Sequence, residues 1–269
     1  MEKNKENGIR KIVDDDLKKF ANQFTERYRN EVNDPKGVIN SKKNNIFISE
    51  LGDEFMFYSA FTRSFDSAFG NFLQTIANDI AELSYTLQGD VSSYLTPQQA
   101  NHIETLMNAY ESHSKPKVSD YENFNSYIPD NVESFKKSHV TDNHFYNPEK
   151  KEHYIIELKA SGDLDIKKAE SEKNALLQEY FILKNELQDS DDKVKIYFGT
   201  AYNIYGEGNE WRQERVKQFF APEELLIGKD YWNFVCDDED GFNIMYDQYK
   251  KSVHYILDSL KEIKELYFN

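Results

Sequence analysis

The segment His153-Tyr154-Ile155-Ile156-Glu157-Leu158-Lys159-Ala160-Ser161-Gly162 joins an apolar run to a carboxylate, a lysine and a closing glycine. Successive side chains of a β-strand point to opposite faces, so Glu157 and Lys159 share one face with Ile155. The segment therefore predicts a strand over 153–160. This strand carries an acid and a lysine together at its end, just before a loop that contains glycine.

A predicted hairpin brings a second carboxylate to this position. The stretch Asn147-Pro148-Glu149-Lys150-Lys151-Glu152 has the composition of a turn, which predicts a partner strand over 138–146. A turn of this length places Asp142 directly opposite Glu157. Opposed residues of a hairpin point to the same face, with Cβ atoms ~5 Å apart. We therefore expect Asp142, Glu157 and Lys159 to converge on one patch.

Apolar residues recur at three- and four-residue spacing elsewhere in the chain, which predicts amphipathic helices. These segments span 9–32, 55–88, 97–110, 166–188, 210–220 and 243–268. Thr96 and Asp165 are candidate helix caps. A further strand is expected over 194–202, and residues 113–136 are predicted to be irregular. A hairpin followed by a helix and a strand favours an α/β fold with a mixed sheet flanked by helices.

The length of 269 residues suits a single domain. Within it we expect a mainly helical part over 1–115, a core over 116–236 and a C-terminal helix over 237–269. The strongest helical stripe steps by three or four residues from Phe61 to Leu87. A buried central helix is its predicted use.

The net charge of −15, from 33 Lys and Arg against 48 Asp and Glu, is unusual for a nucleic-acid-binding protein. Such proteins usually carry a basic footprint, because neutralising phosphates supplies most of the non-specific affinity. Net charge governs solubility and long-range steering, however, whereas binding depends on local fields. An acidic chain can therefore still concentrate its Lys and Arg residues in one cleft.

Cysteine content and hydropathy bound the cellular context. The single cysteine, Cys236, excludes an intrachain disulfide and a cysteine-based metal cage, and its aromatic neighbours predict a core position. Residues 1–8 lack the apolar stretch of a secretory signal, and no apolar run approaches the length of a membrane span. We therefore expect a cytoplasmic location.

Two carboxylates beside a lysine suit metal-assisted hydrolysis of a phosphodiester. Asp142 and Glu157, with the backbone carbonyl of Leu158, offer the oxygen ligands that Mg²⁺ prefers. The ion lowers the pKa of bound water and stabilises developing negative charge, and Lys159 is placed to orient the water. The alternative is a surface salt bridge between Glu157 and Lys159 on an edge strand, since such triplets are common. The pattern alone leaves both interpretations open.

Four segments carry a family resemblance. They are Tyr154 to Lys184, Thr200 to Val216, Glu224 to Cys236, and the helical stretch Arg63-Ser64-Phe65-Asp66-Ser67-Ala68-Phe69-Gly70-Asn71. The first three resemble the TdeIII-like type II restriction endonucleases of the PD-(D/E)XK nuclease superfamily, and the helical stretch resembles an N-terminal element common among such nucleases. Together the four segments cover most of residues 60–236. The first 50 residues and the C-terminal helix do not share this resemblance.

The resemblance implies a restriction-endonuclease-like core with helical N- and C-terminal elaborations. It implies Mg²⁺-dependent cleavage of double-stranded DNA at a short palindromic, GC-rich site with an unspecified central base, leaving 5′-phosphates. Asp142, Glu157 and Lys159 would be its catalytic triad. A palindromic site is matched by a two-fold symmetric protein, so a homodimer is expected. A companion DNA methyltransferase that protects the host genome follows from the same resemblance.

Further candidate residues are weighed against structural roles. Candidate DNA contacts are Lys167, Lys168, Lys173, Asn209, Arg212, Gln213 and Arg215, with Lys217 as an additional backbone contact. The alternatives are a solvated helix face shared with Glu170 and Glu172, and an ordinary connection packed by Trp211. Related nucleases often place a Glu near the metal from an N-terminal helix. Here Gln74 stands in that turn, with Asp66 as a possible substitute.

Two histidines and two rival functions complete the expectations. His139 and His144 flank Asp142 and are interpreted as scaffold or DNA contacts, because no second set of metal ligands has a fitting spacing. One rival function is another PD-(D/E)XK enzyme, a repair or junction-resolving nuclease. The other is an acidic, non-catalytic interaction protein in which Glu157 and Lys159 are merely structural.

Overall fold

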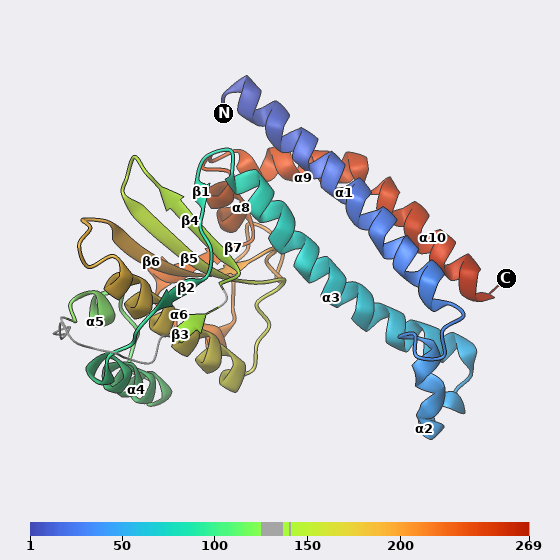
Figure 1. Cartoon of the computed structure of the whole chain (residues 1–269), viewed down its shortest axis with the longest axis horizontal. Helices are drawn as coiled ribbons and strands as arrows, with labels where there is room; N and C mark the ends of the chain where they lie inside the picture. Colours follow the sequence, from blue (N-terminus) through green and yellow to red (C-terminus); the bar gives the residue numbers. More distant parts are fainter. Residues whose placement is uncertain (125–136, 140, 269) are drawn as a thin grey trace. The chain divides into compact units, whose positions relative to one another are not determined.

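The computed structural model describes residues 1–124, 137–139 and 141–268. The chain divides into two compact units, one from residues 1–80 with 240–269 and one from residues 81–239. We call the first the helical unit, because its described elements are all helices, and the second the sheet unit (Figure 1). The single-domain organisation over 1–269 stays a prediction.

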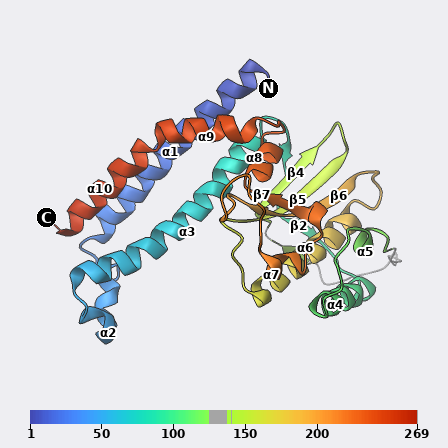
Figure 2. The ribbon, with the colours of Figure 1, turned by 180° about the vertical axis from the view of Figure 1, so that it is seen from behind.

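The helical unit packs three long segments through aromatic side chains. Its elements are α1 (Lys3–Glu31), η1 (Asn40–Asn44), α2 (Ile46–Ser49), α3 (Asp53–Ala81), α9 (Gly241–Ser252) and α10 (His254–Phe268). Phe24 of α1 meets Phe65 of α3, with ring centroids 5.7 Å apart. Tyr28, one turn further along α1, meets Tyr267 of α10 at 6.2 Å, and α1 runs alongside α10 in both views (Figures 1 and 2). Burying such rings supplies much of the stability of this unit.

Three helix predictions for this unit meet different outcomes. The helix over 9–32 is confirmed as α1, which begins earlier at Lys3. The helix over 55–88 is correct only to Ala81, because the chain then turns and Leu87 pairs in a strand. Leu83, the preceding residue of the predicted stripe, is 41% exposed. The single helix over 243–268 is two helices, with a break at Val253.

The sheet unit contains a five-stranded mixed sheet in the order β1-β4-β5-β6-β7. Its strands are β1 (Thr86–Leu87), β4 (Asn143–Asn147), β5 (Glu152–Lys159), β6 (Lys193–Thr200) and β7 (Leu225–Ile227). Pairing is antiparallel from β1 to β5 and parallel from β5 to β7. The mixed α/β fold is thereby confirmed, although β7 was not among the predicted strands.

Helices cover both faces of this sheet. They are α6 (Ile166–Glu186), which connects the parallel strands β5 and β6, and the shorter α8 (Lys229–Val235). Ile155 and Phe198 pack with α6 in one core cluster. On the opposite face, Tyr154 meets Phe234 of α8, with ring centroids 5.0 Å apart. Because Glu157 and Lys159 alternate with Tyr154 along β5, their face is the one that α6 covers.

The remaining elements of the sheet unit are short or peripheral. They are β2 (Val91–Ser93), α4 (Pro97–Glu111), α5 (Ser119–Glu122), β3 (Lys137–His139), α7 (Glu214–Lys217) and η2 (Pro222–Glu224). The predicted cap Thr96 begins α4 with a reciprocal bond pair to Gln99, and Asp165 accepts the Lys168 N–H at the start of α6. Both helix predictions, 97–110 and 166–188, are confirmed.

One strand prediction and one helix prediction are wrong because of how these segments pack in the folded protein. The strand over 138–146 is divided, because β3 pairs with β2 in a separate two-stranded sheet before the chain enters β4. The helix over 210–220 shrinks to α7, since Trp211 and Gln213 are buried from irregular backbone ahead of it. The strand over 194–202 is confirmed as β6, within two residues at its end. Of the predicted irregular segment 113–136, residues 125–136 lie outside the described residues.

Among the described residues, no helix combines the length and the apolar character that crossing a bilayer requires. Cys236 is fully buried, which confirms its predicted core position.

A buried histidine pair in the β4–β5 hairpin makes stability depend on pH. His144 Nε2 lies 3.0 Å from His153 Nδ1, and His144 Nδ1 lies 3.0 Å from the Gly89 carbonyl oxygen. Burial lowers the pKa of His153 to about 4, the neighbouring His144 adds to this, and Asp192 opposes it. The unfolded chain therefore binds a proton, between pH 6.5 and about 4, that the folded chain does not.

We expect this proton to remove up to about 3 kcal/mol of unfolding free energy between neutral pH and pH ~4. The unfolding free energy therefore keeps its full value above the ordinary histidine pKa, and it decreases as the pH falls toward the pKa of His153 in the folded protein. Urea unfolding across this range should show a shallower pH dependence for His153→Gln than for the native chain. His254→Gln, at an exposed histidine, is the control. Equal slopes for the two variants would show that His153 titrates normally in the folded protein.

Candidate active site

The β4–β5 hairpin brings the two predicted carboxylates together. Asn143 pairs with Ile156, so the next residue pair outward from the turn is Asp142 with Glu157. Asp142 Oδ2 accepts a hydrogen bond from the Leu158 N–H at 3.2 Å. The register predicted from the turn is therefore correct. Asp142 directly precedes β4, so the register of the hairpin brings it close to Glu157, and its carboxylate is held there by the bond from Leu158.

Glu157 and Lys159 form an ion pair with little exposure to solvent. Their side chains are 15% and 24% exposed. Burial raises the pKa of Glu157 to about 7, the charge of Asp142 raises it further, and Lys159 acts in the opposite direction. Burial lowers the pKa of Lys159, but Glu157 and Glu172 outweigh this and the net shift is upward. The exposed surface salt bridge considered from the sequence therefore does not describe this pair.

A second acid contacts the lysine from α6. Lys159 Nζ lies 3.1 Å from Glu172 Oε1, and the Glu172 side chain is only 13% exposed. Lys168, one turn earlier on α6, approaches the same carboxylate at 3.8 Å. The interpretation of Glu172 as part of a solvated helix face is therefore wrong. Lys159 is held between a strand carboxylate and a helix carboxylate.

Glu172 was missed although the sequence carries a signal for it. Ala169, Leu176 and Leu183 are buried on the inward face of α6. Glu172 and Glu179 lie at the intervening positions of the same face, where a coiled-coil-like stripe is normally apolar. Glu179 is 3% exposed, and burial raises its pKa to about 8, with nearby carboxylates adding to the shift. Acids at inward positions of a helix that follows the triad are thus a usable indicator.

Backbone geometry also prepares this end of β5. The Lys159 carbonyl accepts from Ala201 N–H at 3.1 Å, on the β6 side. Main-chain groups of successive strand residues point to opposite sides, so the N–H and carbonyl of Leu158 point toward Asp142. Gly162 then turns the chain with φ +69°, and a Cβ there would lie 2.6 Å from Thr200 Cγ2. Only glycine fits this close approach.

The donor set fits a hard divalent cation. Asp142 and Glu157 supply carboxylate oxygens, and the Leu158 carbonyl points to the same side. Burial raises the pKa of Glu157 and the charge of Asp142 adds to this shift, and a bound cation would oppose both effects. Within the described residues, no group of three or more His, Cys, Asp or Glu side chains is arranged around a metal position. The set here consists of two carboxylates and one backbone oxygen.

The predicted DNA contacts on α6 separate into two kinds. Lys167 and Lys168 are exposed in its first turn. Lys173 is fully buried and forms an ion pair with Glu224, which is itself 1% exposed. The Lys173 ammonium also lies 5.0 Å from the centre of the Tyr121 ring. The DNA-binding role predicted for Lys173 is therefore wrong, because its charge is used inside the core.

Several side chains of the loop predicted to contact bases form hydrogen bonds or an ion pair within the protein. Arg212 and Arg215 are exposed, and Arg212 Nε lies 3.5 Å from Glu210. Asn209 is exposed, but its Nδ2 donates to the Tyr205 carbonyl at 2.7 Å. Gln213 is 8% exposed and donates to Asp163 at 3.2 Å. Gln213 is thus a structural residue, contrary to the prediction.

The remaining candidates lie apart in the chain or act as scaffold. Asp66 and Gln74 belong to α3 of the helical unit, and their accessory role stays a prediction. His144 is buried, and its hydrogen bonds to Gly89 and His153 support a scaffold role. His139 lies in β3.

The corrected role of Lys173 can be measured. Removing one partner of a buried ion pair leaves an uncompensated charge, which costs about 3–5 kcal/mol. We expect Lys173→Ala to lower the unfolding free energy by roughly that amount, because Glu224 would stay buried. Lys167→Ala, at an exposed position of the same helix, should change it by less than about 0.5 kcal/mol. Native-like stability of Lys173→Ala would contradict the buried pair.

Comparison with known families completes the description of the site. The family model described as "Type II restriction endonuclease, HinfI" matches residues 5–253. Comparison with curated proteins gave no match, and comparison with solved structures gave none either. The match confirms the expected type II restriction endonuclease, a site-specific nuclease of double-stranded DNA, whereas the TdeIII-like affiliation is not confirmed by it. The matched span holds the hairpin, α6 and most of the helical unit, and the chain belongs to the HinfI family of type II restriction endonucleases.

Proposed function

We propose that the chain hydrolyses phosphodiester bonds of double-stranded DNA at a short palindromic site, with Asp142, Glu157 and Lys159 as its catalytic residues. The observation that carries this assignment is the shielded Glu157–Lys159 pair beside Asp142 at the end of the hairpin. The sequence D-x14-E-x-K has the order of residues in a PD-(D/E)XK site, and the mixed sheet is compatible with that core. The family match favours this function over a non-catalytic interaction protein.

Each residue has a defined task in this proposal. Type II restriction endonucleases generally depend on a divalent metal, and Mg²⁺ would supply Lewis-acid stabilisation and a more acidic bound water. Asp142, Glu157 and the Leu158 carbonyl would hold the ion. Lys159 donates hydrogen bonds to the attacking water and to a phosphate oxygen. Glu172 is a positioning residue, because it contacts the lysine and favours its charged form.

The finer features of the proposal rest on the type of enzyme and on the TdeIII-like resemblance. A homodimer matches a palindromic site, since two-fold symmetry relates both half-sites. The GC-rich composition of the site, with an unspecified central base, rests on the resemblance alone. Products with 5′-phosphates, a cognate methyltransferase and a cytoplasmic location belong to the same proposal. Sedimentation of the purified chain tests the dimer directly.

DNA contacts near the site are proposed for the exposed candidates. Lys167 and Lys168 in the first turn of α6 lie at the end of the loop that follows Lys159, where backbone phosphates would pass. Arg212 and Arg215 are exposed cations of the second loop. The Nδ2 of Asn209 is bound to Tyr205, so Asn209 would contact DNA through its side-chain amide oxygen. Phosphate contacts position a protein on DNA, whereas contacts to base edges give specificity.

The catalytic assignment predicts discrete DNA fragments that require Mg²⁺. We expect Glu157→Ala, Asp142→Ala and Lys159→Ala each to lower the cleavage rate by about a thousandfold or more. We expect the three residues, together with the metal ion that they hold, to stabilise the transition state by several kcal/mol. Each 1.36 kcal/mol that is lost lowers the rate about tenfold. Digestion of phage DNA with and without EDTA, followed by mapping of the ends, measures the activity and reveals the site.

Glu149→Ala is the matched control, because it removes an exposed carboxylate at the turn of the same hairpin. It should cut at the native rate. Cleavage that survives Glu157→Ala would refute the catalytic assignment. Cleavage of branched or damaged DNA without sequence-specific bands would instead identify a repair or junction-resolving nuclease.

The positioning role of Glu172 gives a separate prediction. Glu172→Gln should lower kcat by about tenfold, while the KM for DNA changes little, because the lysine loses one of its two acidic partners. Glu172→Asp, which keeps the charge, should restore part of the rate. Single-turnover cleavage with saturating enzyme separates these effects. An equal loss in both variants would mean that Glu172 acts through packing alone.

A further inference from the structure

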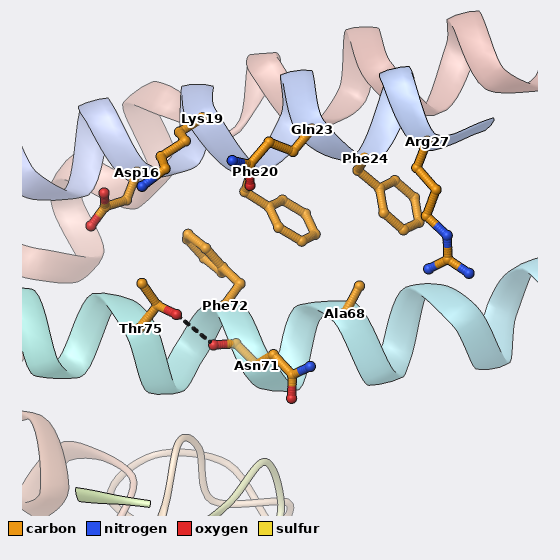
Figure 3. A pocket seen from close by; sticks show the side chains of 10 residues that line it. All are labelled: Asp16, Lys19, Phe20, Gln23, Phe24, Arg27, Ala68, Asn71, Phe72 and Thr75. Carbon is orange, nitrogen blue, oxygen red and sulfur yellow. Dashed lines mark hydrogen bonds between the residues drawn. The ribbon is translucent and has the colours of Figure 1, made fainter. Parts of the chain in front are cut away.

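The helical unit contains a groove that the catalytic assignment does not use. Two adjoining hollows of about 390 and 480 Å³ lie along α1 and α3, and they share Arg27, Ala68 and Asn71 in their linings. Phe20 and Phe72 meet between the two helices, with ring centroids 4.9 Å apart, and close the floor. Figure 3 shows these rings facing one another, with Lys19 toward one end and Arg27 at the other. We call this surface the α1–α3 groove.

Each wall of the groove carries a polar stripe at helical spacing. On α1 the stripe is Lys19, Gln23 and Arg27, four residues apart. On α3 it is Arg63, Ser67, Asn71 and Thr75, again four residues apart. Residues at this spacing lie above one another on one helix face. Both stripes consist of side chains that donate hydrogen bonds, which is the chemistry that recognises phosphate oxygens.

The groove lining carries more basic than acidic side chains. Lys42 joins the lining from η1, and neither Lys42 nor Arg63 has an ion-pair partner among the described residues. Arg27 is the exception, because it contacts Glu31 at 2.8 Å. Asp16 is the acidic residue of the lining, at the Lys19 end. Four cations line the groove, against Asp16 with the nearby Asp79 at the Lys19 end and Glu31 beside Arg27, so the excess of positive charge lies with Lys42 and Arg63.

The distribution of charge over the chain favours this unit for contact with a polyanion. The sheet unit carries 17 Lys and Arg against 30 Asp and Glu, whereas the helical unit carries 16 against 18. The acids of the sheet unit include those that the catalytic assignment needs. DNA therefore meets far less repulsion over the helical unit, where the unpaired cations of the groove also gather.

We propose that the α1–α3 groove binds the sugar-phosphate backbone of double-stranded DNA as a contact separate from the catalytic centre. The stripe from Lys19 to Arg27 extends for ~12 Å, because an α-helix rises about 1.5 Å per residue. One DNA strand presents a phosphate about every 3.4 Å along the helix axis, so the stripe spans roughly three or four phosphates. This inference rests on the DNA-cleaving function proposed above and adds a binding surface to it.

The test compares two triple variants with the same change in net charge. Lys19→Gln, Lys42→Gln and Arg63→Gln together remove groove cations. Lys18→Gln, Lys261→Gln and Lys264→Gln remove exposed cations of the same unit outside the groove lining. Affinity for a fluorescent DNA duplex is measured in EDTA between roughly 50 and 200 mM salt. A native protein that neither binds nor cuts DNA would overturn the proposed function itself.

For the groove triple variant we expect roughly ten- to hundredfold weaker binding, and a log–log salt slope reduced by about 2–3. The control triple should lose little. A charge-conserving triple, Lys19→Arg, Lys42→Arg and Arg63→Lys, should keep native affinity and slope, which separates charge from folding. If the native protein binds and cuts DNA, but both Gln triple variants lose the same affinity, the groove proposal alone would be overturned. Conversion of a dimer to a monomer by the groove triple would assign the surface to a second copy of the chain and also overturn it.

Discussion

The position of the Lys159 ammonium group between two carboxylates is the interaction on which the site depends. Glu157 reaches it from β5 and Glu172 from α6, so the lysine connects the strand to the helix that covers it. Charges with this little exposure persist only when they are paired, because desolvation otherwise costs several kcal/mol. One lysine nevertheless faces more than one acid, since Asp142 lies beside Glu157. The site is therefore short of positive charge, which is the condition that a divalent cation satisfies.

The parts of this site that follow from local rules were predictable from the sequence. The register of the β4–β5 hairpin depends on the turn between the strands, and it determines the position of Asp142. Alternation along β5 places Glu157 and Lys159 on one face, and Asp165 caps the helix that follows. Each of these features involves residues near one another in sequence, so no knowledge of the tertiary structure was needed.

The features that were missed depend on how elements pack. Lys173 and Glu172 are adjacent on α6, yet one is buried against Glu224 and the other faces Lys159. A mixed-charge helix face in the sequence does not reveal this, because the burial of a charged residue depends on its partner 51 residues away. The divided strand has the same origin. The segment that ends at His139 pairs with β2, and alternation alone does not identify the partner.

Net charge is a poor guide to function in this chain, because several of its acidic residues belong to the candidate metal site or are buried rather than exposed to solvent. Asp142 and Glu157 form the candidate metal site, and Glu179 is buried beside them with a raised pKa, so none of these carboxylates acts as a fully exposed negative charge. A nuclease that binds a cation must carry acids close to the scissile phosphate, and these acids repel the DNA until the cation is bound. Affinity for the backbone must then come from cations placed elsewhere on the protein. An acidic sheet unit and a locally positive groove in the helical unit are the arrangement that this requirement favours.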